Sequence, residues 1–264
     1  MNERGSRSPA EVYDDFFVPA LFGQWGNIVA DAADISLGQR VIDVACGTGV
    51  LACSAAERVG NGGAVVGLDP NETMLAVARQ KNSSIEWRKG HAESLPFADE
   101  SFDAVVSQFG FMFFEDQCAA LREMIRVLKP GGRLAVAVCD ALDHSPGYAV
   151  FTELLHRLFG EQVAQSFRAP FVCGDPEQLL SQCAATGISN AKVTRHDGMV
   201  RFKSINAMVS TERACAWTLG SLLDDAQFDR LLKLAEESLH PFLMNNGSIA
   251  FVMPALIITA AKQS

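Results

Sequence analysis

Short apolar segments alternate with amphipathic segments between Arg40 and Cys139. The apolar runs predict strands at Arg40–Ala45, Ala64–Asp69, Ser84–Gly90, Phe102–Gln108 and Arg133–Cys139. Apolar residues at helical spacing predict helices at Gly49–Val59, Asn71–Asn82 and Gln117–Leu128. Strands that alternate with helices in this way arise from right-handed βαβ crossovers. The pattern therefore predicts an α/β fold with a doubly wound, mostly parallel sheet.

The segments on either side of this region have a different pattern. Residues 12–35 are rich in aromatic side chains and predict one or two helices, and helices are also expected at 145–162, 175–187, 207–223 and 226–243. One strand is expected at 188–202 and a closing strand at 249–262. Because no segment has the composition of a linker, we expect one domain over residues 1–264.

Charge and cysteine content narrow the function classes. The formal net charge of −9 argues against a surface for nucleic acid, which needs clustered Lys and Arg. The seven cysteines lack zinc-ligand spacing, so no metal is expected, and they indicate reduced thiols in a cytoplasmic protein. No apolar run is long enough for a signal peptide or a membrane span, so no membrane partner is expected.

The stretch "VIDVACGTGVLACSA" at residues 41–55 predicts a turn that binds a nucleotide-like ligand. Its Gly47-x-Gly49-x-x-Ala52 spacing, with Asp69 further on, fits the dinucleotide fingerprint. However, Asp43 precedes these glycines, and residues 41–57 contain no Lys or Arg. A diphosphate beside Asp43 would be repelled, whereas a sulfonium and an ammonium group would be attracted. The residues therefore favour S-adenosylmethionine (SAM) over NAD.

Four motifs in order carry a resemblance to a known family. "VIDVACGTGVLA", "VVGLDPNETMLAVAR", "GHAESLPFADESFDAVVSQFGFMFF" and "ALREMIRVLKPGGRLAVAV" span roughly residues 39–140 and resemble the class I SAM-dependent methyltransferases, in particular the UbiE-like small-molecule branch. The resemblance implies a Rossmann-like sheet of seven strands with the last antiparallel. It also implies a helical lid at 1–38, a SAM-binding core at 39–140, an acceptor-side cap with the sixth strand at 141–248 and a closing strand at 249–264. Ala45 stands where the family usually has glycine.

The resemblance also assigns roles to individual residues. Asp43 would lie near the methionyl ammonium, the turn Ala45, Cys46, Gly47 and Gly49 near the methionine and ribose, and Asp69 on the ribose hydroxyls. Pro70, Met74, Ala92 and Glu93 would contact the adenine, and Ser107, Gln108 and Phe109 would lie beneath the sulfonium. Each residue also has a structural interpretation: Asp43 as a helix cap, Met74 as core and Glu93 as solvated.

The lid and the acceptor side are the least determined by the sequence. In this branch the N-terminal aromatics face the sulfonium, so we expect Tyr13, Phe17 and Trp25 in the lid, where a cation gains about 0.5–2 kcal/mol. His144 is the one histidine considered as a catalytic residue. No acid–base pair stands out, which favours an acceptor that is acidic or nucleophilic unaided. The cap aromatics Phe151, Phe159, Phe167, Phe171 and Trp217 predict an apolar or aromatic small molecule.

Three functions are therefore weighed. The favoured one is a methyltransferase (EC 2.1.1) that converts SAM to S-adenosylhomocysteine (SAH), as a monomer or a homodimer. The first alternative is a protein that binds SAM without catalysis, because binding motifs and catalysis are separable. The second is an NAD-dependent oxidoreductase, against which Asp43 counts.

Overall fold

A seven-stranded sheet forms the centre of the computed structural model, which describes residues 8–215, 218–220 and 222–263. Its strands are β1 (Arg40–Val44), β2 (Ala64–Asp69), β3 (Glu86–Lys89), β4 (Phe102–Gln108), β5 (Leu128–Cys139), β6 (Lys192–His196) and β9 (Ala255–Ala261). They lie in the order β3-β2-β1-β4-β5-β9-β6. Only β9 runs antiparallel to its neighbours β5 and β6. The predicted α/β fold and its antiparallel last strand are confirmed.

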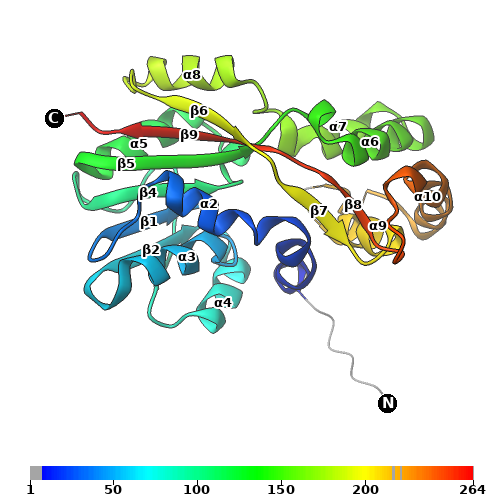
Figure 1. Ribbon diagram of the computed structural model, residues 1–264, viewed down its shortest axis with the longest axis horizontal. Coiled ribbons are helices and arrows are strands. Elements are labelled where there is room, and N and C mark those ends of the chain that lie inside the picture. Colours follow the sequence, from blue (N-terminus) through cyan, green and yellow to red (C-terminus); the bar gives the residue numbers. More distant parts are fainter. Residues whose placement is uncertain (1–7, 216–217, 221, 264) are drawn as a thin grey trace.

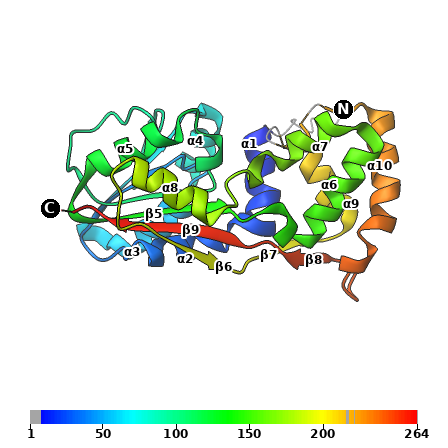
Figure 2. The same cartoon turned by 90° about the horizontal axis from the view of Figure 1, so that it is seen from above.

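Helices cover both faces of this sheet (Figure 2). They include α2 (Trp25–Ala32), α3 (Val50–Val59), α4 (Glu72–Lys81), α5 (Gln117–Val127) and α8 (Pro176–Ala185). Side chains alternate along each strand, so Ile42 packs in the cluster that contains α5 and α8, while Val41 packs in the one that contains α2 and α3. Both residues are fully buried. Strands buried on both faces explain the nearly continuous apolar runs in the sequence.

The N-terminal segment forms three consecutive helices, of which the middle one is a π-helix. A short helix α1 (Pro9–Val12) continues into the π-helix η1 (Tyr13–Phe22), and α2 follows. Ser8 and Glu11 form a capping box at the start of α1. π-helical segments are uncommon and often lie near functional sites. The first part of this segment, α1 and η1, lies between the sheet and the helices of the C-terminal half (Figure 2), and α2 packs on one face of the sheet.

The C-terminal half extends the molecule beyond the end of the sheet (Figure 1). It contains α6 (Pro146–Phe159), α7 (Glu161–Arg168), α9 (Ile205–Ala214), α10 (Asp225–Ser238), and the strands β7 (Met199–Phe202) and β8 (Ile249–Val252). β7 and β8 pair with each other in a separate two-stranded sheet. The 3-10 turns η2 (Gly60–Gly62), η3 (Phe111–Phe113), η4 (Leu142–His144), η5 (Ala169–Phe171) and η6 (His240–Phe242) complete the chain.

Several predicted boundaries in this half are wrong. The expected strand at 188–202 is divided into β6 and β7, and the closing strand into β8 and β9. Both breaks occur at the same place, where Gly198 accepts a hydrogen bond from the Met253 amide and Pro254 lacks a donor. The helix expected at 145–162 ends at Phe159, before Gly160 at φ +83°, and the one expected at 207–223 ends at Ala214. Trp217 lies outside the described residues. No helix in the described ranges is long and apolar enough to cross a membrane.

Candidate functional site

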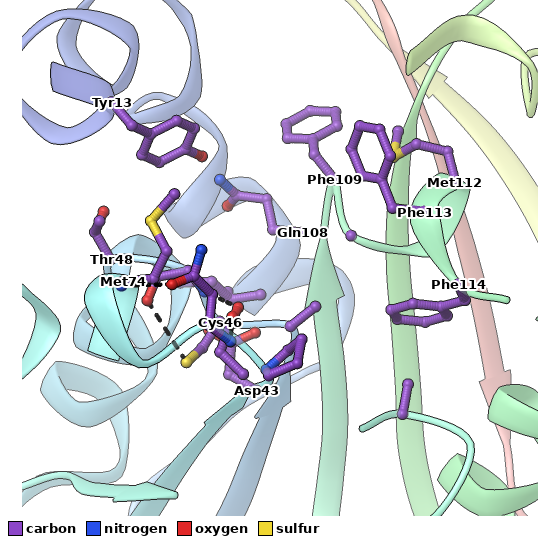
Figure 3. A pocket seen from close by; sticks show the side chains of 18 of the residues that line it. Tyr13, Asp43, Cys46, Thr48, Met74, Gln108, Phe109, Met112, Phe113 and Phe114 are labelled. Atoms are coloured by element: carbon purple, nitrogen blue, oxygen red, sulfur yellow. Dashed lines mark hydrogen bonds between the residues drawn. The ribbon is translucent and has the colours of Figure 1, made fainter. Parts of the chain in front are cut away.

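A cavity of about 700 Å³ opens at the carboxyl ends of the central strands (Figure 3). It lies where the strand order reverses between β1 and β4, the place where open α/β sheets bind their ligands. The volume falls within the range of about 300–1,000 Å³ that is typical of small-molecule sites. Thirteen of the residues predicted from the sequence line it: Tyr13, Phe17, Asp43, Ala45, Cys46, Gly47, Asp69, Pro70, Met74, Ala92, Glu93, Gln108 and Phe109.

Asp43 is a buried acid that no group in the structure neutralises. It points from β1, is 1% exposed, and neither carboxyl oxygen has a hydrogen-bond partner among the described residues. Burial raises the pKa of this carboxyl well above its usual range, and the nearby charge of Asp69 raises it further. The Ala52 amide favours the charged form, although its geometry falls short of a hydrogen bond. Ala52 belongs to the first turn of α3, so this acid lies beside a helix start, and both of its oxygens lack a hydrogen-bond partner among the described residues.

The turn after Asp43 has an unusual backbone. Ala45 has φ +59° and Gly47 has φ +54°, both in the left-handed region. A Cβ on Gly47 would meet nothing within 4 Å, which leaves an open space above this backbone at the cavity wall. Ala45 keeps its Cβ because Gly110 faces it: a Cβ on Gly110 would lie 2.5 Å from that of Ala45. The absence of a side chain at Gly110 thus leaves room for the methyl group of Ala45, at the position where the family usually has glycine.

Gly49 is needed for the conformation and packing of the turn. It is the N-cap of α3 at φ +86°, and a Cβ there would lie 2.5 Å from the Trp87 ring. It does not line the cavity. The first glycine of the pair therefore faces the ligand space, and the second permits the turn and the packing of Trp87.

Asp69 is held in place by the same turn. Its Oδ2 accepts a hydrogen bond from the Gly47 amide at 2.8 Å, and its Oδ1 accepts one from the Asn71 amide at 2.8 Å. Burial raises its pKa, and these two bonds partly oppose that rise. A carboxylate oxygen has more than one lone pair, so each can still accept from a ligand hydroxyl. This arrangement suits two adjacent hydroxyl groups such as those of a ribose.

Residues that follow β2 and β3 form the adjoining part of the wall. Pro70 and the buried Met74 come from the β2–α4 region, and Ala92 and Glu93 from the loop after β3. Glu93 is half-buried, and its Oε1 accepts a hydrogen bond from the Glu115 amide at 2.9 Å, which connects the loop after β3 with the segment before α5.

The Cys46 thiol also lines the cavity. Burial raises the pKa of this thiol well above its usual range, so it stays protonated and unreactive.

Aromatic rings cover the other side of the cavity. Phe22 contacts Tyr13 and Phe109, with ring centroids 5.3 Å apart in both pairs. Phe17 lies 6.1 Å from Tyr13 and is buried. Figure 3 shows Tyr13, Gln108 and Phe109 on the same side of the cavity. The N-terminal π-helix and the end of β4 therefore build one aromatic wall.

Three further predicted residues lie elsewhere. Ser107 is fully buried, without a hydrogen-bond partner for its hydroxyl. Trp25 is 1% exposed and packs against Gly198, where β6 ends, and against Phe109. His144 is half-exposed and its Nδ1 lies 2.9 Å from Asp140 Oδ2, an atom that is also 3.1 Å from Arg195 Nε. None of the three lines the cavity.

Sequence reasoning assigned no role in the site to the other residues that line the cavity. They are Phe22, Thr48, Val50, Leu51, Leu68, Asn71, Glu72, His91, Gly110, Met112, Phe113, Phe114, Glu115, Cys139, Pro170, Cys215 and Thr218. The run Phe111–Phe114 after β4 was a signal that could have indicated part of this set. The cap residues carry no such signal, because only the tertiary fold brings α9 and its following turn to the sheet.

One acid was also missed, immediately behind the cavity wall. Glu212 on α9 is 1% exposed, and its Oε1 accepts a hydrogen bond of 2.9 Å from the Tyr148 hydroxyl. Its Oε2 has no partner among the described residues. Burial raises the pKa of Glu212 to about 7, and the hydroxyls of Tyr148 and Thr218 oppose that rise.

The charged side chains that line the cavity indicate which ligand it can bind. Five acids line the cavity, Asp43, Asp69, Glu72, Glu93 and Glu115, and no Lys or Arg does so among the described residues. Lys81 lies beside the turn, and its charge is paired with Asp14. A dinucleotide diphosphate would find no counter-charge here, whereas the ammonium and sulfonium groups of SAM would. The orphaned Asp43 and the open space at Gly47 fit the same ligand.

Comparison with known proteins agrees with this geometry. Residues 42–136 match the model of a methyltransferase domain family. The chain is 42% identical over 148 residues to a demethylmenaquinone methyltransferase of Renibacterium salmoninarum, covering 56% of this chain and 61% of that protein. It is 39% identical over 132 residues to the ubiquinone/menaquinone biosynthesis C-methyltransferase UbiE of Cronobacter sakazakii, covering 48% and 53%. The chain thus spans about half to three fifths of the length of these relatives.

A solved structure extends the comparison to the whole fold. The crystal structure of a candidate methyltransferase from Bacillus halodurans C-125 covers 90% of this chain and 99% of its own, with a TM-score of 0.62 and 19% identity. At that identity the likeness concerns the fold. The segment from β1 to β5, residues 42–136, therefore matches a methyltransferase domain, and the chain as a whole shares the fold of that solved structure.

Proposed function

We propose that this protein transfers a methyl group from SAM to an aromatic, quinone-type small molecule. The observation that carries the proposal is the buried, unpartnered Asp43 carboxyl in a cavity whose lining has acids but no Lys or Arg among the described residues. SAM supplies an electrophilic methyl group when it is bound. Asp43 would hold its ammonium, Asp69 its ribose hydroxyls, and Ala92 and Glu93 its adenine.

The contribution of the protein to transfer is positioning and exclusion of water. The aromatic wall of Tyr13, Phe22 and Phe109 adjoins the cofactor side, so an acceptor ring stacked there would lie next to the reactive methyl. Holding two reactants in line can supply about 7–11 kcal/mol of the barrier. The names of the two relatives, which act in menaquinone and ubiquinone formation, support a quinone-type ring as the acceptor.

The organisation of the chain follows from the same proposal. The segment 1–38 would act as the lid, 39–140 as the cofactor-binding core, and 141–248 as the acceptor-side cap. The scattered spacing of the seven cysteines supports a reducing compartment, the cytoplasm, and the net charge of −9 supports the absence of a nucleic-acid partner. Association into a homodimer stays a prediction, which light scattering of the purified protein tests.

A transfer assay tests the proposed activity. The protein is incubated with methyl-labelled SAM and 1,4-dihydroxynaphthalene under reducing conditions, and the label in the organic extract is measured. We expect labelled methylnaphthalene derivatives and an equal amount of SAH. Tight SAM binding without labelled product on this or any related hydroxynaphthalene would contradict the proposal and favour a SAM-binding protein that does not methylate.

A further inference from the structure

One polar side chain on the aromatic side of the cavity has an unused hydrogen-bonding atom. Gln108 lies at the end of β4 and lines the cavity. Its Nε2 donates a hydrogen bond to the Phe22 carbonyl at 3.1 Å. Its Oε1 is shielded from solvent and has no partner among the described residues. A buried carbonyl oxygen without a donor carries a desolvation penalty, which a bound donor would remove.

The bond to Phe22 decides which end of the carboxamide is available. Because a backbone carbonyl only accepts hydrogen bonds, the nitrogen of Gln108 must face Phe22 and the oxygen is left over. The side chain therefore has its oxygen as an unused acceptor, and its second N–H lies on the nitrogen that faces Phe22. Phe22 is itself fixed by its ring contacts with Tyr13 and Phe109, so this orientation is supported by the whole aromatic wall.

The position of Gln108 places this oxygen between the two halves of the site. Asp43 and Cys46 lie on one side of it and the rings of Tyr13 and Phe109 on the other (Figure 3). A flat ligand that stacks on the aromatic wall would bring its edge to this oxygen. A hydroxyl on that edge could donate to it, whereas a carbonyl or methoxy oxygen would meet it lone pair to lone pair.

We propose that Gln108 is a specificity-determining residue, whose Oε1 accepts a hydrogen bond from a hydroxyl group on the aromatic acceptor. The inference rests on the proposed function, and it adds a residue that selects among possible acceptor molecules. The cavity would take a ring that bears a hydroxyl and discriminate against the same ring without a donor. This replaces the expectation from the sequence that Gln108 belongs to the floor beneath the sulfonium.

The test uses two compounds with the same ring, 2-naphthol, which has a hydroxyl donor, and 2-methoxynaphthalene, in which a methyl group replaces the hydroxyl hydrogen. Their dissociation constants are measured by calorimetry with the full-length protein saturated with SAH, so that no turnover occurs. We expect the wild type to bind 2-naphthol about tenfold more tightly, as one buried hydrogen bond implies. In Gln108→Leu the two constants should become equal within about twofold, because 2-naphthol alone loses affinity.

Two measurements keep the test decisive. The affinity for SAH, measured first, should be the same in Gln108→Leu as in the wild type, which also shows that the variant folds. Gln182→Leu is the matched control: this half-buried glutamine on α8 does not line the cavity, so the tenfold preference should persist. Absence of SAH binding by the wild type would refute the proposed function itself.

With SAH bound, the remaining outcomes separate the inference from its alternatives. Equal binding of the two rings by the wild type, or no binding of either, would overturn the role of Gln108. A preference that survives in Gln108→Leu would overturn it as well. Weaker SAH binding in Gln108→Leu with an unchanged preference would return Gln108 to the cofactor side.

Discussion

Replacement of Glu212 by glutamine should stabilise the protein in a manner that depends on pH. The fully enclosed carboxyl has a pKa raised from 4.5 to about 7 because burial disfavours its charge. In the unfolded chain the group ionises near 4.5. Between these values the folded state binds more protons than the unfolded state, so stability falls as the pH rises. Below pH 4.5 both states are protonated and the cost is absent.

The size of the effect follows from that interval. Each pH unit between 4.5 and about 7 is worth about 1.4 kcal/mol, which gives about 3 kcal/mol at pH 8. Glutamine is always neutral and can still accept the Tyr148 hydroxyl, so Glu212→Gln avoids this cost. For a chain of 264 residues, about 3 kcal/mol corresponds to a rise in melting temperature of about 6 °C.

Thermal unfolding followed by circular dichroism at pH 5 and pH 8 measures this difference. The advantage of Glu212→Gln should be small at pH 5 and about 6 °C at pH 8. Glu237→Gln, at an exposed position of α10, is the control and should show no such growth with pH. An advantage of the same size at both pH values would refute the reasoning, since it would mean that Glu212 is not held neutral in the fold.

Three other substitutions test the cofactor side. Asp43→Asn should raise the melting temperature of the unliganded protein at pH 7, because asparagine replaces a carboxyl whose ionised form is disfavoured by burial. It should also weaken SAH about tenfold or more by calorimetry, and unchanged SAH affinity would contradict the role of Asp43. Asp69→Ala should weaken SAH by about 1–3 kcal/mol in a protein that remains folded by circular dichroism, and an unaffected constant would remove Asp69 from the ribose site. Ala45→Gly should raise the free energy of unfolding in urea by about 0.5–1 kcal/mol, because the strain of a left-handed alanine exceeds the entropy that glycine loses on folding. A loss of stability would show that the packing of the Ala45 methyl group against Gly110 contributes more than this strain costs.

The sequence predicts the central sheet because local patterns determine it. Four of its first five strands, β1, β2, β4 and β5, contain an apolar run near turn residues, which is enough to locate them, whereas β3 is the polar edge strand Glu86–Lys89. The breaks at Gly198 and Pro254 escaped prediction because the residues on either side, in β6–β7 and β8–β9, have continuous strand character. At the break, the Trp25 ring occupies the space beside Gly198, and Pro254 has no amide hydrogen to donate.

The residues of the candidate site also differ in how far the sequence alone could place them. Asp43, Gly47 and Asp69 lie in local motifs, and the sequence brings them to one edge of the sheet through the strand pattern. Thr218 and Cys215 lie in an irregular segment of the cap, and their position depends on how α9 packs against the N-terminal helices. His144, considered as a catalytic residue because it follows β5, lies 2.9 Å from Asp140 and is not among the residues that line the cavity.

A calorimetric titration of the purified protein with SAH and, separately, with NADH tests the central claim most directly. The buried acid at Asp43 and the absence of Lys and Arg from the described lining predict micromolar binding of SAH and no binding of NADH. Binding of NADH with no binding of SAH would contradict the account, since it would mean that the turn at Gly47 holds a diphosphate beside Asp43.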